Sequence, residues 1–448
     1  MVAPRNVIGW LRRRVGAGIT RLQRVHPAID RAALAAHRLV YTRKFFRDGP
    51  RRVGTSDGLV FVVFNHCYDL DVDALCAAAT PHTLWVLEPF LLFTDAHHFF
   101  APEERDLECV YGTGSQRESI ARIKAAFVTR LARRLVDEAH IDALIAPSDT
   151  FYYLRPLIEE LHALGVPTIV QDKEGTIAPS PMMGEYARVL RERYPPISDL
   201  YLFWNDTVQE FWSGIGVAAE RSRVIGQPRS DFFFHPERWP SKSSLGVRDG
   251  KQLLVAFTYD ANAYIHSTDP RPWQSMRDEL HAALRELARE RPDVDVVVKA
   301  HPQQADLPGL VAEFAADPVP NLTLMSGAKT GSHLLVHADA IVGFQSTVMI
   351  EAMLTRKPVV YAGWGALHDQ HRASLLPIPG SGAVSVPTDR ADFARLMRAA
   401  LDGELATTPE QQRARRLFAD RYFFGADGSV AQRVLAAAAE VAARGPTG

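Results

Sequence analysis

Short apolar runs alternate with stretches of helical period along most of the chain, and this alternation constrains the fold more than any other feature. Runs such as Gly58–Phe64 and Val166–Asp172 have the length of buried strands, whereas the segment from about Gln116 to His140 has the period of a long helix. Strands that alternate with helices form βαβ units around a parallel sheet. The sequence therefore predicts an α/β fold.

The pattern occurs twice. A polar stretch with the turn chemistry of a Gly-x-Pro segment interrupts it near Gly226, and apolar runs resume at Gln252. A chain of 448 residues is also too long for one ordinary core. We expect two Rossmann-like domains with parallel sheets that face each other across a cleft, with these parts: an N-terminal arm (1–52), a first domain (53–230), a linker (231–250) and a second domain with terminal helices (251–448).

The N-terminal arm differs in charge from the rest of the chain. It contains 13 Lys and Arg residues and two acidic residues, while the remainder carries 38 basic and 50 acidic residues. Apolar residues recur in it at helical spacing, which is typical of a basic amphipathic helix. Such a helix can bind an anionic membrane surface, or its apolar stripe can pack on the protein itself. The overall net charge of -1 gives no general attraction to nucleic acid.

The cysteine pattern and the lack of long apolar runs suggest the cellular compartment of the protein. The three cysteines form no CxxC pair, which suits a reducing environment. No apolar run approaches the roughly 18 residues of a membrane span, and the N-terminus lacks the apolar region of a secretory signal. We expect a cytoplasmic protein that can lie at the inner face of the membrane.

The strongest candidate site is the run Asp339–Met353. An apolar strand enters a tight turn, and Ser346 and Thr347 then open a helix. Backbone N–H groups at a helix start attract anions, and the two hydroxyls can donate to a phosphate. Glu351 lies one turn later and could reach a ribose hydroxyl. The alternative is an ordinary helix cap at Ser346.

Two further polar groups follow predicted strands. Lys299 and His301 come at the carboxyl end of an apolar run, where open α/β sheets bind ligands, and both can donate to a phosphate. In the other half, Asp172 and Glu174 follow a strand just before Gly175. A carboxylate there could accept a proton from an acceptor hydroxyl, or it could simply be a solvated turn.

These three sites, in this order, resemble a group of bacterial enzymes. The GT-B sialyltransferases and polysialyltransferases carry a (D/E)(D/E)G motif, an HP motif and paired Ser/Thr residues, and capsule Kdo transferases and CDP-glycerol glycerophosphotransferases look similar in the second half. The corresponding residues here are Lys173-Glu174-Gly175, His301-Pro302 and Ser346-Thr347, with lysine at the first acidic position. The segment Gly226–Asp231 also resembles the Gly-x-Pro-Arg-x-Asp segment of such proteins.

The resemblance implies a metal-independent glycosyltransferase of surface polysaccharide synthesis that needs no cofactor. Its donor would be nucleotide-activated and CMP-linked and would bind the second domain, the nucleotide-donor domain. Its acceptor, a glycan or a lipid-linked molecule, would bind the first domain, the acceptor domain. In those families the second acid is the proposed general base, which would be Glu174. The histidine and the Ser/Thr pair hold the donor phosphate, which would be the role of His301, Ser346 and Thr347.

Other candidates remain. His66 and Asp69 follow the first strand and are candidate acceptor-binding residues together with Asp172; Asp69 is also a substitute base. His368, Asp369 and His371 have a spacing that a metal site can use, although a solvated loop is the favoured interpretation, and we predict no metal site. Alternative functions are a CDP-polyol phosphotransferase, a UDP-sugar 2-epimerase and a non-catalytic scaffold.

Overall fold

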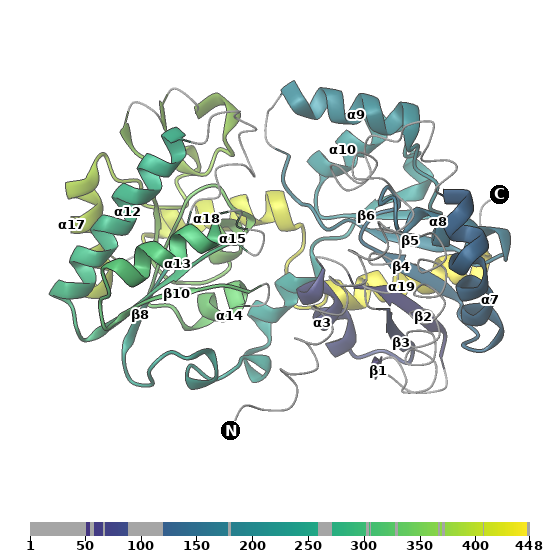
Figure 1. Ribbon diagram of the computed structural model, residues 1–448, viewed down its shortest axis with the longest axis horizontal. Helices are drawn as coiled ribbons and strands as arrows, with labels where there is room; N and C mark the ends of the chain where they lie inside the picture. The colour runs from purple at the N-terminus through teal and green to yellow at the C-terminus, as the bar shows by residue number, and fades with distance from the viewer. Residues whose placement is uncertain are drawn as a thin grey trace, which may run out of the picture.

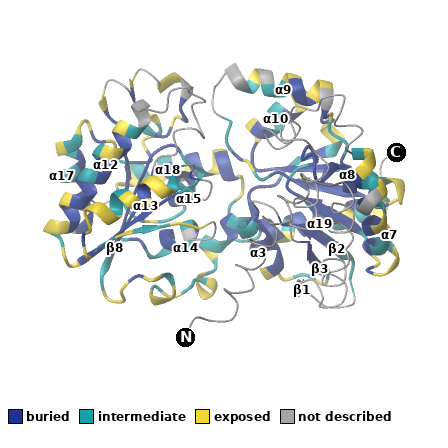
Figure 2. Cartoon of the chain, viewed as in Figure 1, coloured by how far each residue is buried: buried dark blue, intermediate teal, exposed yellow. Residues whose placement is uncertain are grey.

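The computed structural model contains two α/β lobes that lie side by side (Figure 1). The structure describes residues 51–53, 58–65, 68–87, 120–177, 181–258, 271–301, 304, 306–327, 330–365, 368–369, 372–405 and 407–445. Each lobe is built on one sheet with helices on both faces, as the alternating pattern predicts. In Figure 2 the strands are buried, while the outer surfaces of the helices are exposed.

The first lobe contains a seven-stranded sheet of order β1-β3-β2-β4-β5-β6-β7. All neighbours pair in parallel except β1 and β3, which are antiparallel. The strand bounds are Arg51–Val53, Val60–Phe64, Thr83–Leu87, Ala143–Ala146, Thr168–Gln171, Leu200–Phe203 and Ser222–Val224 for β1 to β7. The predicted arm ended at Arg52, but residues 51–53 already form an edge strand of this sheet.

Helices cover both faces of the first sheet. One face packs on α7 and α8, and the other on α3. Strand residues alternate between these faces, so that Val62 and Phe64 lie in one core and Phe61 and Val63 in the other. The helices of this lobe are α3 (Asp69–Ala77), a π-turn (Lys124–Val128) that leads into α7 (Thr129–Asp137), α8 (Arg155–Ala163), α9 (Pro181–Arg193) and α10 (Asp206–Ile215).

The second lobe contains a fully parallel five-stranded sheet of order β10-β9-β8-β11-β12. Its strands are β8 (Gln252–Phe257), β9 (Val294–Lys299), β10 (Leu322–Met325), β11 (Ala340–Gly343) and β12 (Val359–Tyr361). Its helices are α12 (Arg271–Glu290), α13 (Leu307–Ala316), α14 (Thr330–His337), α15 (Thr347–Ala352), α17 (Arg390–Leu401) and α18 (Pro409–Phe423). In both sheets the strand order reverses beside the first parallel strand, which is where open α/β sheets bind ligands.

The last helix corrects the predicted domain boundary. We expected all terminal helices in the second domain, but α19 (Val430–Arg444) packs on the first sheet, where Val434 and Leu435 share a core with Phe61 and Val63. The chain thus crosses between the lobes twice. Both carboxylate oxygens of Asp231, in the first crossing segment, accept backbone N–H groups of Val430 and Ala431 at 2.9 and 2.8 Å. The two crossings are therefore fixed to each other.

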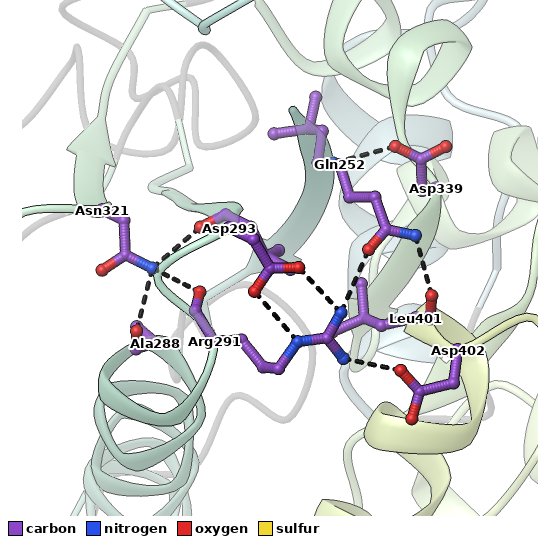
Figure 3. Close-up of polar contacts among 10 residues, drawn as sticks. Gln252, Ala288, Arg291, Asp293, Asn321, Asp339, Leu401 and Asp402 are labelled. Carbon is purple, nitrogen blue, oxygen red and sulfur yellow. Dashed lines mark hydrogen bonds and ion pairs between the residues drawn. The ribbon is translucent and has the colours of Figure 1, made fainter. Parts of the chain in front are cut away.

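A polar network fixes the amino ends of the second sheet, away from the loops that carry the candidate site (Figure 3). The Nδ2 atom of Asn321 lies within 2.9 Å of three carbonyl oxygens, including those of Ala288 and Val294. Arg291 donates to Asp293 and to Asp402, at 3.0 and 2.7 Å, and so joins α12 to the end of α17. These contacts connect the ends of α12 and α17 to the amino ends of the strands.

Candidate functional site

The loop after β5 is held by a buried carboxylate. Asp172 accepts the backbone N–H of Glu174 at 3.0 Å and the indole N–H of Trp212 at 2.7 Å, and its own carbonyl accepts the indole N–H of Trp204 at 2.6 Å. Burial raises the pKa of Asp172 to about 7, against the effect of these hydrogen bonds. Asp172 is therefore not the solvated acid that one interpretation of the sequence allowed. Its contacts hold the loop after β5 in position.

Glu174 is the exposed member of this loop. Its side chain is 64% exposed, and its carboxylate lies 4.0 Å from the Lys173 ammonium. Gly175 follows and packs on Trp204, because a Cβ atom there would lie 1.5 Å from the indole ring. Only glycine fits this position, and the close approach fixes the direction in which Glu174 leaves the sheet.

The loop after β11 begins a short helix. Ser346 is the N-cap of α15, and its hydroxyl accepts the backbone N–H of Val348 at 3.3 Å. This confirms the cap that the sequence offered as the alternative to a phosphate site; a second role for the hydroxyl, and the role of Thr347, stay predictions. Both residues lie at the carboxyl edge of the second sheet, at its reversal point.

Glu351 points to the junction of the lobes. Its carboxylate is buried, with Oε1 lying 2.9 Å from Arg229 Nε and Oε2 accepting the Ser332 hydroxyl at 2.6 Å. The expectation was a contact with a ribose. The structure gives the carboxylate two protein partners, and a ribose contact remains a prediction.

Arg229 is the residue that joins the two lobes at this site. Besides Glu351 it contacts Asp71 in α3, whose Oδ1 accepts the Arg229 backbone N–H at 3.2 Å and whose Oδ2 lies 3.8 Å from the guanidinium. The guanidinium also lies over the ring of Trp204, 4.8 Å from its centroid, which is cation–π geometry. Helix α3 of the first lobe, helix α15 of the second lobe and the ring of Trp204, on which Gly175 packs, therefore share one cation.

Burial and neighbouring charges act in opposite directions on the pKa values of Asp71 and Arg229. Burial raises the pKa of Asp71 to about 6, although the Arg229 charge opposes the rise. Burial acts to lower the pKa of Arg229, but the charges of Glu351 and Asp71 outweigh it and raise that pKa. The charge of Glu174 contributes to the pKa of Arg229 in the same direction.

Lys299 and His301 lie at the carboxyl end of β9, as predicted. The Lys299 side chain is buried, its ammonium donates to the Ala300 carbonyl at 2.5 Å, and burial lowers its pKa to about 8. His301 is half-buried, and its backbone N–H donates to Gln304 at 3.4 Å. The histidine is thus the more accessible of the two for a ligand phosphate.

The remaining predicted residues have different surroundings. His66 lies outside the described residues, and Asp69 accepts the Asn65 amide at 3.1 Å. His368 is buried and lies 3.3 Å from the Tyr361 hydroxyl, so the solvated-loop interpretation is wrong for this residue. Within the described residues no group of three or more His, Cys, Asp or Glu side chains could hold a metal ion.

Sequence reasoning missed Arg229, Asp71, Trp204 and Ser332. Arg229 lies in the segment Gly226–Asp231, whose Gly-x-Pro-Arg-x-Asp pattern is visible in the sequence. No role for Arg229 followed from the sequence, because its partners come from both lobes. An unusually placed arginine in a turn between two domains is the signal that could have singled it out.

Two facing Rossmann-like lobes, with polar loops at the carboxyl edges of both sheets and at their junction, define the GT-B architecture of enzymes that use nucleotide-activated donors. The CDP-glycerol:poly(glycerophosphate) glycerophosphotransferase family matches residues 191–439, more than half of the chain. The chain belongs to this family. No curated protein gives a significant match to the sequence.

The chain is similar to several solved structures. One is a Listeria monocytogenes protein described as a UDP-N-acetylglucosamine 2-epimerase, with 14% identity, a TM-score of 0.50 and coverage of 86% of this chain and 96% of that chain. Another is the Neisseria meningitidis UDP-GlcNAc 2-epimerase bound to UDP-GlcNAc, with 12% identity, a TM-score of 0.49 and coverage of 86% and 100%. At 14% identity the similarity to the Listeria protein concerns the fold alone.

Proposed function

We propose that the chain transfers a polyol phosphate from a CDP-linked donor to a hydroxyl group of a surface polymer or of its lipid-linked precursor. The observation that carries the proposal is the family match, which includes the second lobe and the segment that contains Arg229. The arrangement agrees with it, because the candidate donor residues follow parallel strands of the second lobe and an exposed carboxylate follows a parallel strand of the first lobe.

The proposed step is a displacement at phosphorus. The acceptor oxygen forms a bond to the β-phosphorus of the donor, the bond from that phosphorus to the bridging oxygen breaks, and CMP leaves with the electron pair. Glu174 takes the acceptor proton. His301, Ser346 and Thr347 stabilise the charge that develops on the departing phosphate.

Arg229 has a positioning role in this scheme. It holds Glu351 and Asp71 across the junction, and its position over Trp204 connects it to the ring on which Gly175 packs. Closure of the donor lobe and orientation of the Glu174 loop would therefore depend on the same side chain.

The direct test has two stages. Calorimetric titration with CMP, CDP, UMP, UDP and GDP, first without added metal, is expected to show preference for a cytidine nucleotide. Incubation with CDP-glycerol and a glycerol-phosphate primer is then expected to release CMP and lengthen the primer. Preference for UDP would instead favour a UDP-sugar enzyme, and binding of no nucleotide would favour a non-catalytic scaffold.

A second candidate is transfer of a sugar from a CMP-linked donor to a glycan. It is supported by the sequence Lys173-Glu174-Gly175 followed by His301-Pro302 and Ser346-Thr347. Here the acceptor oxygen attacks the anomeric carbon and CMP leaves. The test is a CMP-linked donor whose sugar carries an isotope label. The label would appear in the product only under this alternative.

We also propose that the N-terminal arm brings the enzyme to an anionic membrane surface, where lipid-linked acceptors lie. The support is its charge and helical period, since residues 1–50 lie outside the described part of the chain. Among the described helices, none is long and apolar enough to cross a bilayer.

A further inference from the structure

A pocket of about 500 Å³ lies between the lobes, and none of the predicted donor or base residues lines it. Ile177 and Thr207 contribute to it from the first lobe, and Leu375 and Leu376 from the second. Tyr422, at the end of α18, completes the wall. Pockets of this size between domains are common binding sites for small ligands.

One wall is fixed to the donor loop. Gln345, which directly precedes Ser346, is buried, and its Oε1 atom accepts the backbone N–H of Leu376 at 2.7 Å. Its amide nitrogen donates to the Tyr361 hydroxyl at 2.8 Å. The apolar wall formed by Leu376 therefore keeps its position relative to the proposed phosphate site.

The opposite wall is fixed to the loop of the proposed base. The amide nitrogen of Asn205 donates to the Gly175 carbonyl at 2.7 Å and to the Tyr422 carbonyl at 3.0 Å. Ile177, which lines the pocket, comes three residues after Glu174. The pocket is thus bordered by both loops at once.

The sheet order separates this pocket from the phosphate end of the donor site. His301 follows β9, on one side of β8, whereas the pocket residues after β12 lie on the far side of β11. A donor held between His301 and Ser346 leaves the β12 side open. An acceptor that enters there would lie beside Ile177, which belongs to the loop of Glu174.

The residues that line the pocket indicate the chemical class of its ligand. The walls include Leu375, Leu376 and Val386, and Arg372 and Arg421 lie among the lining residues. Among the described lining residues none is acidic, although Arg372 also donates to the carboxylate of the neighbouring Asp369 at 3.1 Å. Apolar walls with exposed arginines suit a ligand that has both an apolar part and a phosphate.

We propose that this pocket is the acceptor subsite, and that it binds a phosphate-bearing molecule with an apolar body. The inference rests on the proposed transferase function for its role in turnover, but binding to the pocket can be measured without turnover. The phosphate lies against Arg372 and Arg421, and the apolar part lies against Leu375, Leu376 and Val386.

The test uses n-octyl phosphate as the probe and the full-length protein. Calorimetry is expected to show binding of n-octyl phosphate that the double variant Arg372→Glu/Arg421→Glu weakens by about tenfold or more, because two attractive charges near the phosphate become repulsive. Both arginines are exposed, so the fold should survive. Arg416→Glu, an exposed charge reversal on the same helix, is the matched control and should leave binding unchanged.

A second variant tests the apolar wall independently. Val386 is 38% exposed, so Val386→Asp should fold, and it places an acid in the pocket. It is expected to weaken n-octyl phosphate binding by about tenfold while CDP binding stays within about twofold of the unmodified protein. Inorganic phosphate and n-octyl glucoside should each bind far more weakly than n-octyl phosphate.

Three results would overturn the proposal. The protein could fail to bind n-octyl phosphate, all variants could bind n-octyl phosphate as tightly as the unmodified protein, or inorganic phosphate could bind as tightly as n-octyl phosphate. These results are separate from a failure of the proposed function. If the protein binds no cytidine nucleotide but the variants still lose n-octyl phosphate, the pocket assignment stands and the transferase proposal fails.

Discussion

The Nε atom of Arg229, in the segment that connects the lobes, lies 2.9 Å from Oε1 of Glu351 in the second lobe. Because the Arg229 backbone also donates to Asp71 of the first lobe, this ion pair is part of a connection between the two halves. Its side chains are mostly buried, so each charge depends on the others for compensation.

Arg229→Ala is expected to lower the free energy of unfolding by about 3 kcal/mol, because it leaves two buried carboxylates without their cation. Denaturant unfolding followed by fluorescence measures this. The matched control is Arg433→Ala, which removes a more exposed pair with Asp427 and should cost less than about 1 kcal/mol. Equal losses in both variants would contradict a special role for Arg229.

Glu174→Gln should lower kcat by about 10² to 10⁴-fold, the range expected when a general base is lost, and leave the Kd for the cytidine nucleotide almost unchanged. His301→Ala should instead weaken nucleotide binding and turnover together, because it removes a donor to the phosphate. Calorimetry and initial rates separate the two effects. Glu192→Gln, an exposed acid of the same lobe that pairs with Arg188, serves as control. Full activity in Glu174→Gln would eliminate it as the base.

Gly175→Ala should displace the loop that carries Glu174, since the new Cβ would lie 1.5 Å from the ring of Trp204. We expect a loss of activity together with changed indole fluorescence. Gly214→Ala is the matched control, because no atom lies within 4 Å of a Cβ built at this position in α10. Alanine there should stabilise the helix by up to about 1 kcal/mol. A fully active Gly175→Ala protein would show that the close packing does not matter.

Asp172 predicts a pH dependence of stability. Its pKa is raised from 3.8 to about 7 in the folded protein, so the folded state binds the proton more tightly than the unfolded chain. Its contribution to stability is therefore complete below pH 3.8 and is lost as the pH rises to 7. Relative to the unmodified protein, Asp172→Asn should become progressively more stable as the pH rises from 3.8 to about 7. Denaturant unfolding at several pH values in this window would show the change. A difference that stays constant with pH would contradict the assignment.

Deletion of residues 1–50 should reduce sedimentation with anionic vesicles and spare nucleotide binding, because the arm carries the excess of basic residues. The deletion ends before β1, so the edge strand of the first sheet is kept. Neutral vesicles of the same size provide the control. Equal binding of both proteins to anionic vesicles would remove the membrane proposal.

The sequence by itself determined the two α/β halves and most of their strands. The period of apolar residues is a local property, and it predicts a buried strand such as Val294–Lys299 or a helix such as Arg271–Glu290 without knowledge of the rest of the chain. The same local reasoning placed Lys299, His301 and Ser346 at the ends of strands of one sheet.

Only the tertiary structure decided which parts meet across the junction. An apolar helix face does not specify its partner sheet, which is why α19 was assigned to the wrong half. Nor does sequence reveal that Asp172 is buried beneath Trp212, or that Arg229 lies between Asp71 and Glu351. These contacts join residues far apart in the chain, and their energies depend on burial and distance, which the fold alone sets.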